Sequence, residues 1–225
     1  MTADKYTAKP RSQQERSRRT EQILLDSALQ LFRERGVDAV TVGDIASVAG
    51  VAPATIYRRF GDKDGLLREA FARFVLDSLK MLELAPAVKH PHFIQLVADV
   101  TALVLTFSRT NQRLLQSSYA KALVDSFYTE QLVTLRSRTV KMLKDFFLQF
   151  TDQIGHEKPG VAIDFALRQA MAMVTARMEA GQLEVEQGAI PDAVFVRELM
   201  RSILSYLKVS FTAQAIDKAL RARGI

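Results

Sequence analysis

The chain of 225 residues contains no cysteine and no tryptophan, and it has only 6 prolines and 10 glycines. Without cysteine, neither a disulfide framework nor a thiolate metal site can form, which fits a reducing cytoplasm. Few residues interrupt helices, whereas leucine, alanine, glutamine and arginine, which favour helix, are plentiful. The composition therefore predicts an all-α protein, and we expect it to be cytoplasmic.

Signals for secretion, membrane insertion and catalysis are also scarce. The N-terminus lacks the apolar stretch of a secretory signal. The most apolar segment, residues 97–107, contains Asp99 and is followed by Arg109, so we expect it to be too short and too polar to span a bilayer. His90 and His92 flank a proline with no carboxylate nearby to complete a metal site. With no phosphate loop, nucleophile elbow or HExxH motif, the sequence predicts neither an enzyme nor a cofactor.

Positive charge is concentrated at the N-terminus. The formal net charge is +6, and residues 1–20 alone carry six basic and two acidic residues. Residues 1–17 form a basic arm without the apolar content needed to fold alone. This arm is either a solvated tail or a segment that contacts DNA phosphates or a minor groove.

Residues 18–62 have the pattern of a helix-turn-helix domain. A helix from Ser12 or Ser17 to Arg35 carries an apolar stripe and ends at Gly36, which we expect to be a left-handed C-cap. Thr41 and Asp44 form a capping box at the start of a second helix that ends by Gly50. A third helix follows at residues 53–60 and a fourth begins after Asp62. A short turn between the second and third helices is typical of helix-turn-helix proteins.

The third helix has distinct inner and outer faces. Ile56 and Phe60 point inward, which at about 100° per residue leaves Ala54, Thr55 and Arg58 outward, with Tyr57 and Arg59 on the flanks. In a major groove Arg58 would donate to a guanine, and the Thr55 methyl would meet a thymine methyl. The alternative is an ordinary solvent-exposed helix face.

The stretch ILLDSALQLFRERG and the following VTVGDIASVAGVAPATIYRRFGDKDGLL resemble the DNA-binding domain of TetR-family repressors, over residues 18–75. The resemblance implies phosphate contacts by Thr41, Tyr57 and Lys63, and a base or phosphate contact by Thr55. Ala52, Ala54 and Arg59 depart from residues frequent in the family, so no operator sequence is predicted. The positions expected at DNA are Thr41, Ala52, Pro53, Ala54, Thr55, Tyr57, Arg58, Arg59 and Lys63.

Residues 63–225 have the pattern of a series of consecutive helices. The resemblance implies that these helices form a ligand-binding and dimerisation domain. We expect helices at 63–84, from 93, around 113–119, and at 126–154, 161–179 and 192–211, with a last short one ending near Arg223. The resemblance assigns dimerisation to residues 161–211 and a cavity to the middle helices. The candidate pocket residues are Asp99, Phe107, Tyr119, Met142, Phe146, Arg168, Met171 and Met178.

Each pocket candidate has a plainer alternative. The aromatic and methionine side chains can be core packing, and Asp99 and Arg168 can form salt bridges on helix surfaces. The effector is either a flat apolar molecule or an acyl-type compound. We hypothesise a homodimeric repressor that a small-molecule effector releases from double-stranded DNA carrying an inverted repeat. The alternative is an architectural DNA-binding protein that needs no effector.

Overall fold

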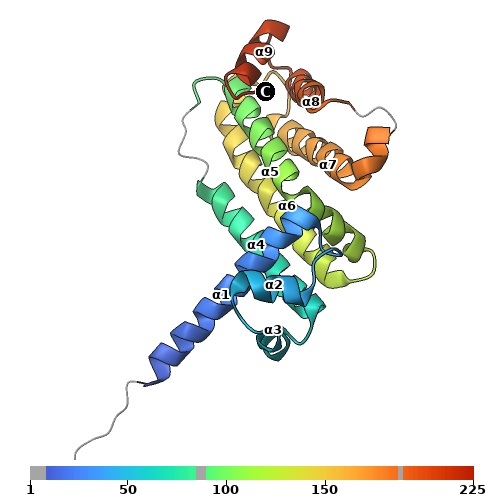
Figure 1. Ribbon diagram of the computed structural model, residues 1–225. Coiled ribbons are helices and arrows are strands. Elements are labelled where there is room, and N and C mark those ends of the chain that lie inside the picture. The colour runs from blue at the N-terminus through green and yellow to red at the C-terminus, as the bar shows by residue number, and fades with distance from the viewer. Residues whose placement is uncertain (1–8, 85–89, 187–189) are drawn as a thin grey trace, which may run out of the picture. The chain divides into compact units, whose positions relative to one another are not determined.

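The computed structural model describes residues 9–84, 90–186 and 190–225, and in these ranges every regular element is a helix (Figure 1). The expected all-α fold, with an N-terminal helix-turn-helix followed by a helical domain, is confirmed. The chain divides into two compact units, residues 1–74 and 75–225. The boundary falls inside one helix, α4 (Lys63–Leu84), twelve residues beyond the expected boundary at Asp62.

The first unit contains α1 (Lys9–Arg35), α2 (Val42–Ala49), α3 (Pro53–Phe60) and the first half of α4. Its core is built where these helices meet, and α4 contributes Leu66, Leu67, Phe71 and Phe74 to it. This explains why the unit extends to Phe74. The fully buried side chains of this core are Leu24, Ala28, Phe32, Val40, Ile45, Ile56, Leu66, Ala70 and Phe71.

α1 begins earlier than the sequence predicted. It starts at Lys9, so residues 9–17 of the expected arm are helical. This segment lacks proline after its first turn and has no glycine, and arginine, glutamine and glutamate have good helix propensity. The Thr20 hydroxyl donates to the backbone oxygen of Arg16 at 2.9 Å, which closes one turn. Residues 1–8 lie outside the described residues.

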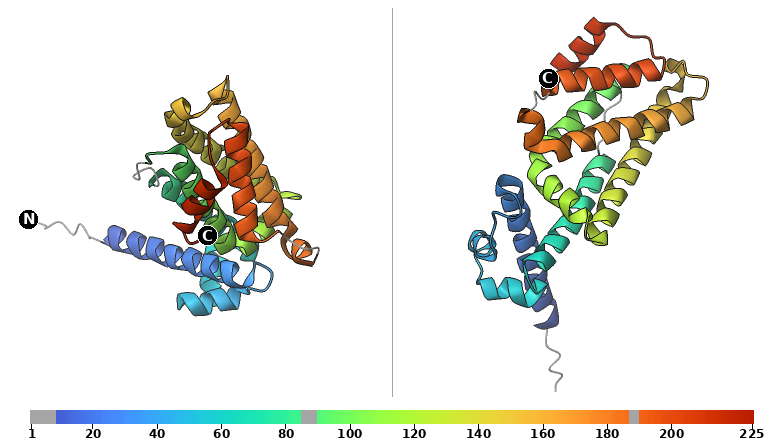
Figure 2. Two further views of the ribbon diagram at one scale, coloured as in Figure 1. Left: turned by 90° about the horizontal axis from the view of Figure 1, so that it is seen from above. Right: turned by 90° about the vertical axis from the view of Figure 1, so that its right-hand side faces the viewer.

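The second unit is arranged around α5 (Phe93–Ala122), which packs against α6 (Ser126–Phe147), α7 (Pro159–Glu186), α8 (Asp192–Tyr206) and α9 (Ala213–Arg221). A 3-10 segment, η2 (Leu148–Gln153), continues α6. α7 and α8 lie against each other (Figure 2). α5 is therefore the helix through which the others of this unit are connected.

α5 is one uninterrupted helix, and the expected break before a separate piece at 113–119 was wrong. The polar residues in this region bond back along the helix instead of ending it. Ser108 donates to the Val104 oxygen at 2.7 Å, and Asn111 donates to the Phe107 oxygen at 2.9 Å. Such bonds to the preceding turn let short polar side chains sit in a helix interior.

α5 is also longer than the apolar segment read from the sequence. By length and composition it could cross a membrane, so the expectation that this region is too short and too polar was wrong on that criterion. Here it packs against four neighbouring helices and buries Phe93, Val97 and Leu114. A central core helix meets the same length and composition criterion.

α8 ends at Tyr206 rather than at residue 211, where the sequence placed it. Lys208 has a positive φ of 54°, and the Val209 amide donates back to the Leu204 oxygen at 2.9 Å. This left-handed residue closes the helix and turns the chain toward α9.

Candidate nucleic-acid interface and ligand cavity

The start of α2 is fixed by the predicted capping box. The Asp44 amide donates to the Thr41 hydroxyl at 3.1 Å, and the Thr41 amide donates to the Asp44 carboxylate at 2.8 Å. The Thr41 hydroxyl also donates to that carboxylate at 2.6 Å. This hydrogen bond from the hydroxyl, followed by the one from the Thr41 amide, holds the pKa of Asp44 below its ordinary value. The Thr41 side chain is thus held in one position at the exposed end of α2.

The turn between α2 and α3 requires a left-handed residue. Gly50 has φ 67°, and the next amide, of Val51, donates to the Ala46 oxygen at 3.0 Å. A β-carbon is disfavoured at such a φ. α3 then begins with Pro53 in its first turn, and Ala52 supplies no side-chain cap, as its missing hydroxyl predicts.

α3 presents the face that its sequence pattern predicted. Ile56 is fully buried, whereas Ala54, Tyr57 and Arg58 are exposed, Tyr57 by 53%. Ala52 and Pro53 are also exposed, and Thr55 is half-buried at the edge of this face. These side chains therefore form a continuous outer surface on α3, with an arginine and a tyrosine hydroxyl available to a ligand.

Arg59 is engaged with α1. Its guanidinium donates to the Glu21 carboxylate at 2.6 Å and to the Ser17 hydroxyl at 2.8 Å (side chain 23% exposed). Arg59 therefore joins α3 to the N-terminal half of α1. This pairing could not be predicted from the sequence, because Glu21 and Ser17 lie about 40 residues from Arg59 along the chain.

The turn from α3 into α4 depends on Gly65, which the sequence analysis did not single out. The Gly65 amide donates to the Asp62 carboxylate at 2.7 Å, which caps the first turn of α4. A β-carbon at Gly65 would lie 2.0 Å from the backbone oxygen of Phe60. This close approach fixes how α4 leaves α3, and it places half-buried Lys63 at the start of α4.

The second unit contains several cavities, and two of them adjoin each other at α5 and α7. The first, which we call the polar cavity, has a volume of about 200 Å³ and lies between α5, α7 and α8. The second, the apolar cavity, has a volume of about 70 Å³ and is lined by residues of α4, α5, α6 and α7. Val104, Ser108, Val174 and Met178 line both, so the two cavities share a wall.

Half of the predicted pocket residues line the apolar cavity, namely Phe107, Tyr119, Met171 and Met178. Met142 and Phe146 line neither cavity. α6 lines the apolar cavity with residues from its earlier turns, and Met142 lies beyond them. The residues of α6 at the cavity are Leu132, Leu135, Arg136 and Thr139.

The two predicted charges also lie outside the cavities. Asp99 pairs with Arg223 and lies 3.2 Å from His90 Nδ1. Arg168 donates to the Asp164 carboxylate at 2.7 Å, and this hydrogen bond holds the pKa of Asp164 below its ordinary value. Both residues form salt bridges, which is the alternative that the sequence left open for them.

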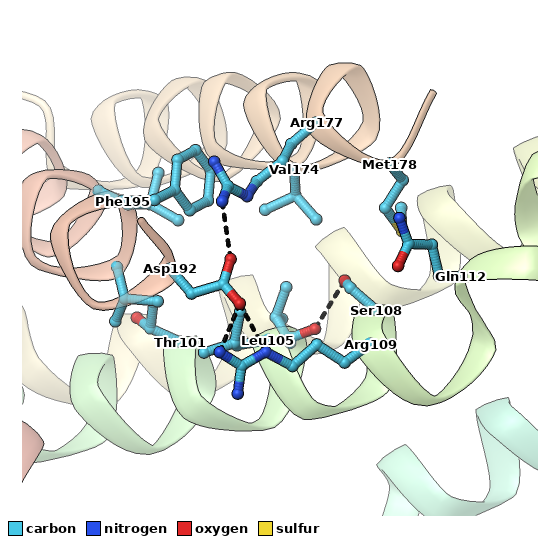
Figure 3. A pocket seen from close by; sticks show the side chains of 13 residues that line it. Thr101, Leu105, Ser108, Arg109, Gln112, Val174, Arg177, Met178, Asp192 and Phe195 are labelled. Carbon is cyan, nitrogen blue, oxygen red and sulfur yellow. Dashed lines mark hydrogen bonds and ion pairs between the residues drawn. The ribbon is translucent and has the colours of Figure 1, made fainter. Parts of the chain in front are cut away.

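The charged residues that line the polar cavity were missed. Asp192, the first residue of α8, accepts from Arg177 of α7 at 2.7 Å and from Arg109 Nε of α5 at 2.6 Å (Figure 3). The Arg177 guanidinium also lies over the Phe195 ring, 4.7 Å from its centroid. Only the packing of three helices brings these residues together.

Comparison with known proteins identifies the first unit. Residues 24–70 match the family model described as bacterial regulatory proteins, tetR family. The HTH-type transcriptional repressor KstR2 of Rhodococcus jostii is 45% identical over 60 residues, which cover 27% of this chain and 28% of that protein. The HTH-type transcriptional regulator AcrR of Shigella flexneri is 32% identical over 104 residues, 46% of this chain and 48% of that protein. The chain thus spans less than half the length of either relative.

A solved structure extends the likeness in fold to both units. The tetR-family transcriptional regulator from Streptomyces coelicolor has a TM-score of 0.64 at 18% identity, covering 92% of this chain and 86% of that one. A capped helix-turn-helix with an exposed recognition helix, followed by a helical unit, defines the class of helix-turn-helix transcription regulators. Residues 24–70 are a helix-turn-helix of the tetR type, and the whole chain is similar in fold to a solved tetR-family regulator. Its relatives named above are transcription regulators, not enzymes.

Proposed function

We propose that this protein is a homodimeric transcriptional repressor that binds an inverted-repeat operator and releases it when a small molecule binds. The exposed outer face of α3, with Ala54, Tyr57 and Arg58, is the observation that carries the proposal. Arginine reads guanine edges in a major groove, and a tyrosine hydroxyl donates to phosphates. The name of the Rhodococcus relative, a transcriptional repressor, supports repression rather than activation.

Exposed apolar side chains on α7 and α8 support dimerisation through these helices. Phe165 is 54% exposed and Val161 is 67% exposed, in a protein whose other large apolar side chains are mostly buried. The rings of Phe165 and Tyr206 lie 5.2 Å apart between centroids, so exposed apolar surface continues from α7 to α8, as at association sites. In a two-fold dimer the recognition helices would enter successive major grooves about 34 Å apart, which requires an inverted repeat. The exposed apolar residues of the surface are Val161, Phe165, Met173, Val194 and Tyr206.

The position of α4 supports effector control. Met81 and Leu82, near its C-terminal end, line the apolar cavity, whereas its first half belongs to the helix-turn-helix unit. A ligand that moves these residues acts on a helix that continues into the DNA-binding unit. The coupling must be reciprocal, so operator DNA weakens ligand binding by the factor by which ligand weakens DNA binding.

The test is a fluorescence-anisotropy titration with DNA from upstream of the protein's own gene, using random DNA as the control, at two salt concentrations. Affinity that exceeds the control by about a thousandfold and weakens steeply with salt supports a specific regulator. If no fragment from a genome-wide selection binds better than random DNA, the proposal is wrong and an architectural role takes its place.

A further inference from the structure

The carboxylate of Asp192 occupies a site built from two arginines. Arg177 donates to one of its oxygens at 2.7 Å, and Arg109 donates to the other through Nε at 2.6 Å. Figure 3 shows the carboxylate between the two guanidinium groups, which come from α5 and α7. The same arrangement of two guanidinium donors would bind the carboxylate of a ligand.

The charge of the polar cavity favours an anion. Arg109, Arg177 and Asp192 are its charged lining residues, so the cluster has a net charge of +1. Burial raises the pKa of Asp192, but the hydrogen bonds from the two arginines outweigh this and hold the pKa below its ordinary value. Asp192 is therefore ionised and already paired with two cations, which leaves little attraction for a cationic ligand.

The surroundings of the cluster are apolar. Leu105, Phe195 and Leu199 line the polar cavity, and the apolar cavity lies on the other side of the wall that the two share. A molecule that fits both therefore needs a compact charged head and an apolar tail. Thr101, Ser108 and Gln112 provide the remaining polar side chains. The further lining of the apolar cavity includes Leu82, Leu103, Phe107, Leu115, Leu132 and Met171.

We propose that the effector is an amphiphilic carboxylate whose head replaces Asp192 between Arg109 and Arg177 and whose tail extends toward the apolar cavity. The inference rests on the proposed function in that it names the chemical class of the effector. When the ligand head replaces it, Asp192, the first residue of α8, no longer anchors that helix to α5 and α7. Part of α8 belongs to the proposed dimer surface, so the exchange links ligand binding to that surface.

The experiment measures binding of decanoate, 1-decanol and decylamine to the full-length protein by isothermal titration calorimetry. Decanoate should bind most tightly, because only its head matches two guanidinium donors. Arg177→Gln should weaken decanoate binding about tenfold or more and leave 1-decanol binding unchanged. Arg168→Gln is the matched control on the same helix, since Arg168 pairs with Asp164 outside the cavities. It should bind all three compounds as the unaltered protein does.

Asp192→Asn gives the sharpest outcome. If Asp192 competes with the ligand head, removing its charge should tighten decanoate binding about tenfold, whereas a merely structural Asp192 would give weaker or unchanged binding. Arg109→Gln repeats the arginine test at a more exposed side chain if Arg177→Gln does not fold. The proposal is overturned if the protein binds 1-decanol or decylamine as tightly as decanoate. It is also overturned if Asp192→Asn does not raise the affinity for decanoate.

Calorimetry without DNA separates this proposal from the proposed function. Specific DNA binding with no preference for decanoate would overturn the carboxylate site alone. Decanoate binding with the expected variant effects, but no specific DNA binding, would keep the site and overturn the regulatory role.

Discussion

Arg59 of the recognition helix and Glu21 of α1 form an ion pair with a guanidinium-to-carboxylate distance of 2.6 Å. The pair connects α3 to the N-terminal half of α1, whose exposed arginines include Arg16, Arg18 and Arg19. The position of this basic segment relative to α3 is therefore set partly by a side chain of α3 itself.

A double-mutant cycle on Arg59→Ala and Glu21→Ala should give a coupling free energy of about 0.2–1 kcal/mol, because the pair is partly exposed. Denaturant unfolding measures it, and hydrogen exchange should become faster around Ser17 in both single variants. Since Arg59 is engaged with α1, Arg59→Ala should also reduce DNA affinity less than Arg58→Ala does. A coupling free energy of zero together with unchanged hydrogen exchange around Ser17 would show that the Arg59–Glu21 pair does not connect α3 to α1.

Tyr57 and Arg58 should affect DNA binding in different ways. Tyr57→Phe removes a hydroxyl expected at a phosphate, so affinity should fall similarly for all DNA sequences. Arg58→Ala should reduce the preference at one base position by about 1–3 kcal/mol. Anisotropy titrations against single-base variants of the selected operator distinguish the two. Equal losses on operator and random DNA for Arg58→Ala would remove it as a base-reading residue.

Gly65→Ala should lower the free energy of unfolding by more than about 1 kcal/mol, because the new β-carbon meets the Phe60 oxygen. Gly43 is the matched control: it lies in α2, where a β-carbon makes only an ordinary 3.5 Å contact with the Thr41 hydroxyl. Gly43→Ala should leave stability unchanged or raise it by up to about 1 kcal/mol. If both variants unfold alike in urea, the close approach at Gly65 has no energetic consequence.

The capping box of α2 should make stability depend on pH. The folded pKa of Asp44 lies below its ordinary value, so its stabilisation is present above about pH 3.9 and is lost as the pH falls through the folded pKa. Thr41→Val removes the hydroxyl donor, and its stability deficit should therefore be smaller at about pH 3 than at neutral pH. Thr41→Ser keeps the hydroxyl and should follow the unaltered protein. A deficit that is constant with pH would mean that Asp44 does not depend on the Thr41 hydroxyl.

Phe165→Glu should convert the proposed dimer to a monomer, because it places a charge in the apolar surface of α7. Sedimentation equilibrium measures the change, and affinity for an inverted repeat should fall while affinity for a half-site is kept. Val133→Glu, at a 50% exposed apolar side chain of α6, is the control and should remain dimeric. A dimeric Phe165→Glu variant would place the interface elsewhere.

The sequence predicted those parts of the fold that depend on neighbouring residues. Thr41, Asp44 and Gly50 define the bounds of α2 through contacts within a few residues, and the structure shows the same capping box and turn. The unbroken course of α5 was not predicted, because the pattern of Ser108 and Asn111 does not reveal that their side chains bond along the helix.

The cavity was predicted only in its apolar part. Aromatic and methionine residues on apolar helix faces pointed to Phe107 and Met171, which do line it. The cluster of Arg109, Arg177 and Asp192 depends on how three distant helices pack, and each residue alone resembles an ordinary surface charge. No local pattern distinguishes such a cluster from the salt bridge between Arg168 and Asp164.

Because α4 is divided between the two units, only certain N-terminal fragments of the protein can fold by themselves. A fragment that stops at Asp62 would contain all three helices of the predicted DNA-binding domain, yet it would lack Leu66, Leu67 and Phe71, which complete their core. Its apolar faces would be open to water, and it should aggregate or remain partly unfolded. A fragment meant to fold by itself has to extend at least to Phe74, so limited proteolysis should release a stable N-terminal piece only when the cut falls late in α4.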